Sequence, residues 1–83
     1  MIPLGNISRL LIKKMNAKDI GAYVASERKR QGVTQLQLAQ AVNVGRRFIV
    51  DLEGGKETLQ IGKLLKVLSV LGIELTLNEP VGV

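Results

Sequence analysis

The stretch VTQLQLAQAVNVGRRFIVDLEGGK, residues 33–56, opens with the clearest helix start in the chain. The hydroxyl of Thr34 can accept a hydrogen bond from a backbone N–H, and Gln37, three residues later, can bond back to form a capping box. Val33, just before the cap, can pack on Leu38 as a hydrophobic staple. Together these signals predict that a helix begins immediately after Thr34.

A second short helix should follow the first after a tight turn. The first helix is predicted over about residues 35–42, because Asn43 is one of the few non-glycine residues that tolerate a positive φ. The next helix would carry Ile49 and Leu52 inward, until the glycine pair at 54–55 stops it. The quoted stretch therefore predicts a helix, a tight turn and a second helix.

Two further helices should flank this pair. One is predicted over residues 17–31, with Gly32 placed to end it in the left-handed conformation. The other is predicted over about residues 61–71, with Gly72 at its end. Apolar residues cover more than one narrow face of this last helix, so part of its surface should pack beyond the other three helices.

The tail after the last helix alternates apolar and polar side chains and predicts a strand. Ile73, Leu75 and Leu77 would share one face of it. A lone strand needs a neighbour, and a chain of 83 residues gains burial by oligomerising. The same segment of a second subunit is the predicted neighbour, so these three residues are predicted to form a homodimer. Only the N-terminal segment competes for that role.

Residues 1–15 have no single interpretation. Their apolar residues suit one helical face, and equally a short strand or a loosely docked arm. Lys13 and Lys14 would be either a phosphate-seeking arm or solvated charge, and the pattern favours solvated charge. The predicted organisation is an N-terminal arm or extension at 1–15, a helical domain at 16–72, and a dimerising strand and tail at 73–83.

The composition favours a nucleic-acid partner and gives no support to catalysis. Twelve Lys and Arg against seven Asp and Glu leave a net charge of +5, with the excess concentrated in residues 1–32. The chain has no Cys and no His, so the commonest metal ligands and the commonest general base are missing. We expect no enzyme activity, no metal and no cofactor. No apolar run reaches the ~20 residues of a membrane span, and no secretion signal precedes the domain, so a cytoplasmic protein without a membrane partner is expected.

Residues 20–71 resemble the Cro and lambda-repressor class of helix-turn-helix domains, also called XRE type. The resemblance rests on residue types at the family's spacings: Gln35, Leu38, Ala39, Ile49, Leu52, Glu53, Gly55 and Lys56. It implies a mainly α fold, a lambda-repressor-like domain of four to five helices with a C-terminal β-strand that pairs across a dimer. It also implies double-stranded DNA as the partner.

Two arginines occupy the first turn of the helix that such domains place in the major groove. Arg46 and Arg47 can each present a bidentate fork to guanine O6 and N7, so both are predicted to read bases. The alternative is an ordinary solvated helix end. That alternative is weakened because two positive charges at the positive end of a helix dipole are unfavourable in the free protein.

Supporting contacts are implied at four further positions. By resemblance Gln35 contacts phosphate and braces the recognition helix. Thr34 can donate to a phosphate at the same helix start, although capping is its main predicted duty. Gly45 stands where the family generally has Ser or Thr, and it loses a hydroxyl that would touch phosphate. Lys56 would neutralise a phosphate beyond the recognition helix.

Other side chains near the motif can be interpreted as structural or solvated rather than as DNA contacts. Phe48 is either a core plug or an apolar surface for thymine methyls, and core packing is favoured. By resemblance Arg28 pairs with Glu53 as a structural ion pair. Lys29 and Arg30 are either rim phosphate contacts or part of a solvated face.

The segments GRRFIVDLEGGK, residues 45–56, and LGIELTL, residues 71–77, are similar to the HipB group of antitoxins. That similarity implies a dimer that represses its own operon at a palindromic operator and binds a HipA-type serine/threonine kinase toxin. Two alternatives remain: a stand-alone XRE-type regulator, and a protein-interaction module with a vestigial helix-turn-helix. The arginine pair and Gln35 argue against the last, and the strand-forming tail favours the antitoxin over the stand-alone regulator.

Overall fold

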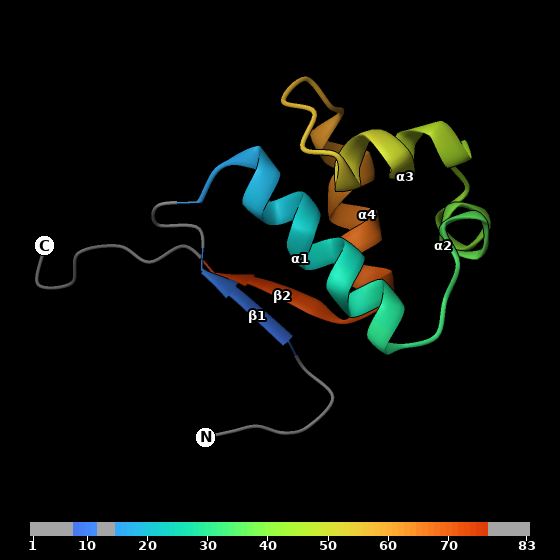
Figure 1. Cartoon of the computed structure of the whole chain (residues 1–83), viewed down its shortest axis with the longest axis horizontal. Coiled ribbons are helices and arrows are strands. Elements are labelled where there is room, and N and C mark those ends of the chain that lie inside the picture. Colours follow the sequence, from blue (N-terminus) through green and yellow to red (C-terminus); the bar gives the residue numbers. More distant parts are fainter. Residues whose placement is uncertain (1–7, 12–14, 77–83) are drawn as a thin grey trace, which may run out of the picture.

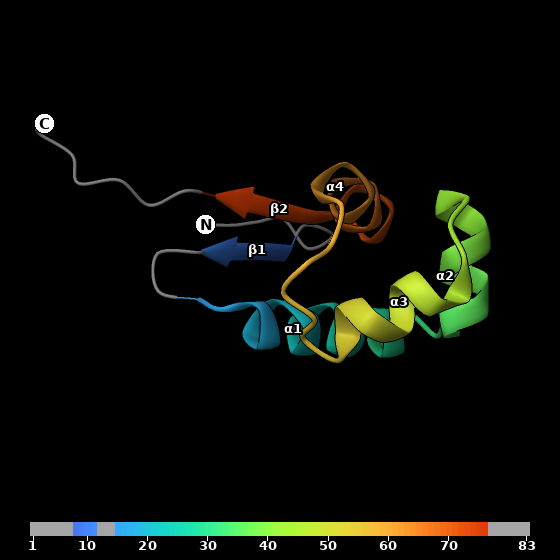
Figure 2. The same cartoon turned by 90° about the horizontal axis from the view of Figure 1, so that it is seen from above.

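The computed structural model describes residues 8–11 and 15–76, and it contains the helices and the C-terminal strand that the sequence predicts (Figure 1). In chain order the elements are β1 (Ser8–Leu11), α1 (Ala17–Arg30), α2 (Gln35–Val42), α3 (Arg46–Glu53), α4 (Ile61–Leu71) and β2 (Ile73–Thr76). Seen from above, α1 and α3 form one layer, α4 and the two strands form the other, and α2 lies across one end (Figure 2). The predicted mainly α, lambda-repressor-like fold is confirmed.

Local signals place the ends of the helices. Thr34 accepts from the backbone of Gln37, whose side chain accepts from the Thr34 N–H, so the predicted capping box is present. Asn43 ends α2 with a φ of 59°, as the turn requires. A second capping box, formed by Asn16 and Asp19, starts α1. The sequence analysis did not predict this second box, although it is an equally local signal.

The core forms where the four described helices meet β2. Its buried apolar residues are Val24, Leu38, Ala39, Val42, Ile49, Leu52, Val67, Leu68, Leu71 and Ile73. Helices α1 and α3 approach closely at Gly21, where an added Cβ would collide with the carbonyl oxygen of Leu52. Because this site admits only glycine, it fixes how α3 lies against α1 and therefore how α3 faces solvent.

The neighbour of β2 within the chain is β1. The two strands pair in parallel, with Ser8 opposite Ile73 and Leu11 opposite Thr76. The predicted neighbour was the same strand of a second subunit, with the N-terminal segment as the competing candidate, and the competing candidate occupies one edge of β2. Parallel strands require a long crossover, and the four helices between β1 and β2 supply it.

Parts of the predicted terminal segments lie outside the described residues. These are residues 1–7, 12–14 and 77–83, which include Lys13, Lys14 and Leu77. Residues 8–11 of the predicted arm form β1, so the short-strand interpretation holds for them. No helix within the described part of the chain is long and apolar enough to cross a membrane.

Candidate nucleic-acid interface

The first turn of α3 presents two exposed guanidinium groups. Gly45 is the N-cap of α3 with φ −71° and ψ 150°, and it makes no side-chain cap. Arg46 and Arg47 follow it as the first two residues of the helix, and both are exposed. Because no cap side chain covers the start of α3, both arginines are accessible to a ligand.

A chain of hydrogen bonds anchors Arg46 to the interior of the domain. Arg46 Nη2 donates to Gln35 Oε1 at 3.1 Å, and Gln35 Nε2 donates to Glu53 Oε1 at 3.0 Å. Glu53 in turn accepts from Arg28 Nε at 2.6 Å and from Arg28 Nη2 at 2.9 Å. The ion pair that the resemblance implied is therefore present, and Gln35 connects it to Arg46 at the start of α3.

The Arg28–Glu53 pair is nearly closed to solvent. The two side chains are only 10% and 8% exposed, and Arg28 Nη1 also donates to the carbonyl oxygen of Val33 at 2.9 Å. Burial by itself raises the pKa of the Glu53 carboxyl, but hydrogen bonds from Arg28 and Gln35 and the charges of Arg28 and Lys29 outweigh burial and hold that pKa below its ordinary value. Glu53 is therefore an anion at neutral pH, and its acceptance from Nε2 turns the oxygen of the Gln35 amide toward Arg46.

An open groove runs between these groups on the surface. The residues that line it are Arg28, Lys29, Gly32, Val33, Thr34, Gln35, Leu36 and Arg46. It joins the end of α1 and the start of α2 to the start of α3, so Thr34, Gln35 and Lys29 lie beside Arg46. Cationic and amide donors gathered at the N-terminus of a helix suit a phosphate group.

On the other side of α3, one carboxylate joins two cations. Asp51 Oδ1 lies 3.3 Å from Arg47 Nε, and Asp51 Oδ2 lies 3.6 Å from Lys56 Nζ. Arg47 is therefore paired along its own helix, whereas Arg46 is paired across to α2. Sequence reasoning did not single out Asp51, although its spacing four residues after Arg47 was a visible signal.

A helix-turn-helix family model matches residues 24–78, from α1 through β2. The chain belongs to the helix-turn-helix family. It is of the XRE type, and members of this class are DNA-binding regulators of transcription. The chain is 53% identical over 62 residues to "Uncharacterized HTH-type transcriptional regulator y4mF" of Sinorhizobium fredii, a match that covers 75% of this chain and 82% of that protein.

Two solved structures share the helix-turn-helix fold with a TM-score of 0.73 and 21% identity. One is described as "MDT Protein", and the match covers 81% of this chain and 94% of that chain. The other is described as "HipB-O1-O2 complex", and the match covers 81% of this chain and 97% of that chain. At this level of identity the likeness is one of fold.

Within the helix-turn-helix motif, Phe48 packs on the core rather than facing outward. Its half-buried ring contacts the core cluster, and Lys63 Nζ lies 5.9 Å from the ring centroid. This geometry favours the predicted core plug over a surface for thymine methyls. The recognition helix therefore offers polar groups, chiefly the two arginines, at its start.

Residues 29 and 30 of α1 lie in different environments. Arg30 pairs with Glu27 on the same helix at 2.8 Å, and its side chain is 59% exposed. Lys29 is exposed and lines the groove beside the start of α2. The solvated-face interpretation suits Arg30, and the rim-contact interpretation suits Lys29.

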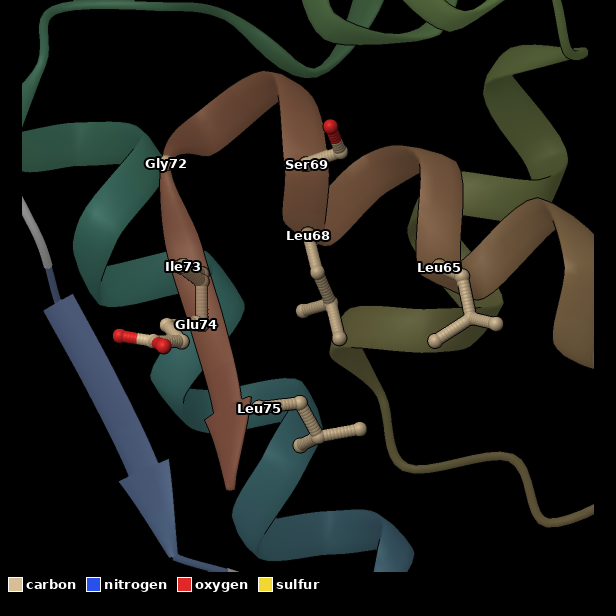
Figure 3. A pocket seen from close by; sticks show the side chains of 7 residues that line it. All are labelled: Leu65, Leu68, Ser69, Gly72, Ile73, Glu74 and Leu75. Carbon is tan, nitrogen blue, oxygen red and sulfur yellow. The ribbon is translucent and has the colours of Figure 1, made fainter.

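The described residues that were predicted to form the dimer differ in burial. Ile73 is 5% exposed and its side chain belongs to the core of its own chain, and its role at a dimer interface stays a prediction. Leu75 is half-buried and lines a second groove, between α4 and β2. In Figure 3 the side chains of Leu65, Leu68 and Leu75 point into this groove, and β1 lies along the opposite edge of β2. Leu65, which sequence reasoning did not assign to an interface, is 46% exposed there.

No group of three or more potential metal-ligating His, Cys, Asp or Glu side chains occurs among residues 8–11 and 15–76.

Proposed function

We propose that this chain is a sequence-specific repressor that binds a palindromic operator as a dimer. The observation that carries the proposal is the exposed arginine pair at the start of α3, with Arg46 anchored through Gln35 to the buried Glu53. Arg46 and Arg47 would each present guanidinium donors to guanine in the major groove. A braced side chain loses less conformational freedom on binding, which favours base selection over loose attraction to phosphate.

The groups around the arginines would hold the backbone of the DNA. Gln35 and Thr34 lie at the start of α2, where backbone N–H groups favour a phosphate, and Lys29 lines the same groove. Lys56 lies beyond the end of α3 and would contact a phosphate on its other side. Gly45 permits close approach of the backbone at the start of α3 but contributes no hydroxyl.

A second copy of the chain would cover the α4–β2 groove and the adjoining edge of β2. A two-stranded sheet is marginal on its own, and pairing of β2 with its symmetry mate would give a four-stranded sheet in the order β1, β2, β2, β1. The exposed Leu65 and the half-buried Leu75 would then be covered by the partner. Two recognition helices related by a two-fold axis imply a palindrome with half-sites about one helical turn apart.

The finer proposal is that the protein is an antitoxin that represses its own operon and binds a HipA-type serine/threonine kinase toxin. It is supported by the similarity of residues 45–56 and 71–77 to the HipB group and by the fold shared with the HipB complex. The stand-alone regulator is the second candidate, because the relative from Sinorhizobium fredii is described only as a transcriptional regulator. Purification of the chain with a kinase-like protein encoded beside it separates the two: a stable complex supports the antitoxin, and its absence favours the regulator.

Titration against DNA tests the repressor itself. The probes are the duplex upstream of the chain's own gene and random-sequence duplex, at the same salt concentration. The double variant Arg46→Ala/Arg47→Ala should lose the preference for the upstream duplex, at about 1–3 kcal/mol for each arginine. The variant Lys18→Ala/Lys66→Ala removes the same charge from exposed positions on α1 and α4 and should keep the preference. Equal binding of both duplexes by the wild-type chain would contradict autoregulation.

A further inference from the structure

The Asp51 carboxylate stands where a DNA-binding surface should carry no negative charge. It lies one turn after Arg47 on α3, and each of its oxygens faces a different cation, Arg47 or Lys56. An anion at this place repels phosphate, and exposed pairs at this helical spacing add little to stability. The small gain in stability therefore does not explain an aspartate at this position. The geometry of its two ion pairs suggests a role in DNA binding instead.

The contact with Asp51 engages one specific part of the Arg47 side chain. Nε is the guanidinium atom that lies 3.3 Å from Oδ1, while the side chain of Arg47 remains 84% exposed. A guanidinium is planar and presents its donors in a rigid fork. An ion pair at Nε therefore favours one orientation of the whole group, and the exposed side chain keeps guanidinium donors accessible for a bidentate contact with guanine.

The second oxygen of Asp51 restrains a cation that is not part of α3. Lys56 Nζ lies 3.6 Å from Oδ2, and its side chain is 51% exposed while that of Asp51 is 20% exposed. A lysine binds phosphate as a point charge without selecting a sequence. A carboxylate between Arg47 and Lys56 weakens the attraction of both cations for any phosphate backbone, while it orients only the arginine.

We infer that Asp51 is a positioning residue that makes DNA binding selective. It directs the Arg47 fork toward a base edge and reduces the attraction of Arg47 and Lys56 for unrelated DNA. The inference rests on the proposed function, because it requires that Arg47 reads a base. The inference also assigns the two arginines different orienting groups. Arg46 is oriented by the neutral amide of Gln35, and Arg47 is oriented by an anion.

The test compares Asp51→Asn with Glu57→Gln. Both remove one negative charge from neighbouring parts of the surface, but Glu57 is exposed and six residues further along the chain, and only Asp51 pairs with Arg47. The probes are the duplex that the wild-type chain enriches most from a randomised library and an unselected random-sequence duplex. Asp51→Asn should lower the ratio of the two affinities about tenfold, the size of one good base contact, and Glu57→Gln should leave it unchanged.

Salt dependence adds a readout that a purely structural role would not change. Asp51→Asn should bind random duplex more tightly and with a salt slope steeper by about one unit for each released cation. Asp51→Glu, which can still pair at the same helical spacing, should restore the ratio. In an Arg47→Ala background, Asp51→Asn should leave the ratio unchanged, because the residue through which it acts is gone.

The outcomes separate this inference from the function on which it rests. If the wild-type chain enriches no sequence, the proposed sequence-specific repressor is wrong. If it enriches one that Arg47→Ala binds poorly, and Asp51→Asn then behaves like Glu57→Gln, positioning by Asp51 is wrong and the repressor stands. A loss of ratio that persists in the Arg47→Ala background would likewise overturn positioning through Arg47.

Discussion

Among single residues, Glu53 connects the packing of the domain to the interface. Its carboxylate accepts from Arg28 on α1 and from Gln35 on α2, and Gln35 accepts from Arg46 on α3. One buried anion thus holds side chains from three helices. Removing it would leave Arg28 buried without its partner and Gln35 free to turn its amide, so a change at this position affects stability and recognition together.

Glu53 should make stability fall in acid. Its pKa lies below the ordinary value of 4.5 in the folded chain, so the folded state binds a proton less readily than the unfolded state. Its contribution to stability is therefore fully present above about pH 4.5 and is lost as pH falls through the folded pKa. Thermal unfolding from about pH 6 down to pH 3 should show a steeper loss for wild type than for Glu53→Gln. Parallel curves for the two proteins would contradict this role.

Gly45 should accept a serine with a small gain in stability. It is an N-cap with extended φ and ψ, nothing lies within 4 Å of an added Cβ, and the start of α3 has no side-chain cap. Gly45→Ser should raise the free energy of unfolding by a few tenths of a kcal/mol, because serine caps slightly better than glycine. Gly45→Ala is the control, and it should destabilise because alanine cannot cap. Urea denaturation measures both, and equal effects of Ser and Ala would contradict the capping argument.

For the helices, a glycine contact sets the orientation of the recognition element. An added Cβ at Gly21 would meet the Leu52 carbonyl oxygen and push α1 away from α3. Gly21→Ala should therefore lower the free energy of unfolding by about 1–3 kcal/mol. Gly62→Ala, in the first turn of α4 with open space around the new Cβ, should instead raise it by roughly 0.5–1 kcal/mol. Urea denaturation distinguishes opposite signs for the same chemical change, and two gains would show that α1 and α3 can separate without cost.

The elements that the sequence predicts well are those whose signals are local. The α2 start at Thr34, the positive φ of Asn43 and the end of α4 at Gly72 each depend on a few neighbouring residues. The pairing of β1 with β2 joins segments separated by four helices, so no local pattern identifies it. The close approach at Gly21 likewise depends on a residue of another helix, and a glycine inside a helical pattern gives no warning of it.

The site divides in the same way between local patterns and tertiary contacts. Arg46 and Arg47 were predicted from their place in the motif, since the start of the recognition helix can be located from sequence. Which partner restrains each arginine depends on side chains brought together by folding: Gln35 from α2 for one, and Asp51 for the other. Residue types at a spacing therefore identify the candidate readers, while their orientation requires the structure.

In the molecule as a whole, the charged surface at α3 and the apolar α4–β2 groove lie in separate places. Arg46, Arg47 and Lys56 are exposed, but each contacts a polar or acidic side chain of its own chain. Such an arrangement suits DNA, a ligand that combines a charged backbone with a base sequence. The α4–β2 groove instead exposes Leu65 beside an apolar lining. An exposed apolar groove next to a short, marginal sheet costs stability in water unless something covers it. The two surfaces are coupled if the same dimer contact that covers the groove also spaces the recognition helices.

That coupling predicts that one charge in the α4–β2 groove abolishes tight operator binding without touching the DNA surface. Leu65→Lys places an ammonium group in the groove, and it should convert a dimer to a monomer in sedimentation while helicity is kept. Val70→Lys is the control, because Val70 lies on the same helix and is 49% exposed against 46% for Leu65, but it lines a different groove. Only Leu65→Lys should lose affinity for the palindromic duplex, by about 100-fold or more, since a monomer binds each half-site without the effective concentration supplied by its partner.

The affinity of Leu65→Lys for a single half-site should be unchanged, because Arg46 and Arg47 lie on α3, outside the groove. A dimer that survives Leu65→Lys but not Val70→Lys would move the subunit interface to the other groove, and a wild-type chain that sediments as a monomer would remove the paired-strand dimer altogether.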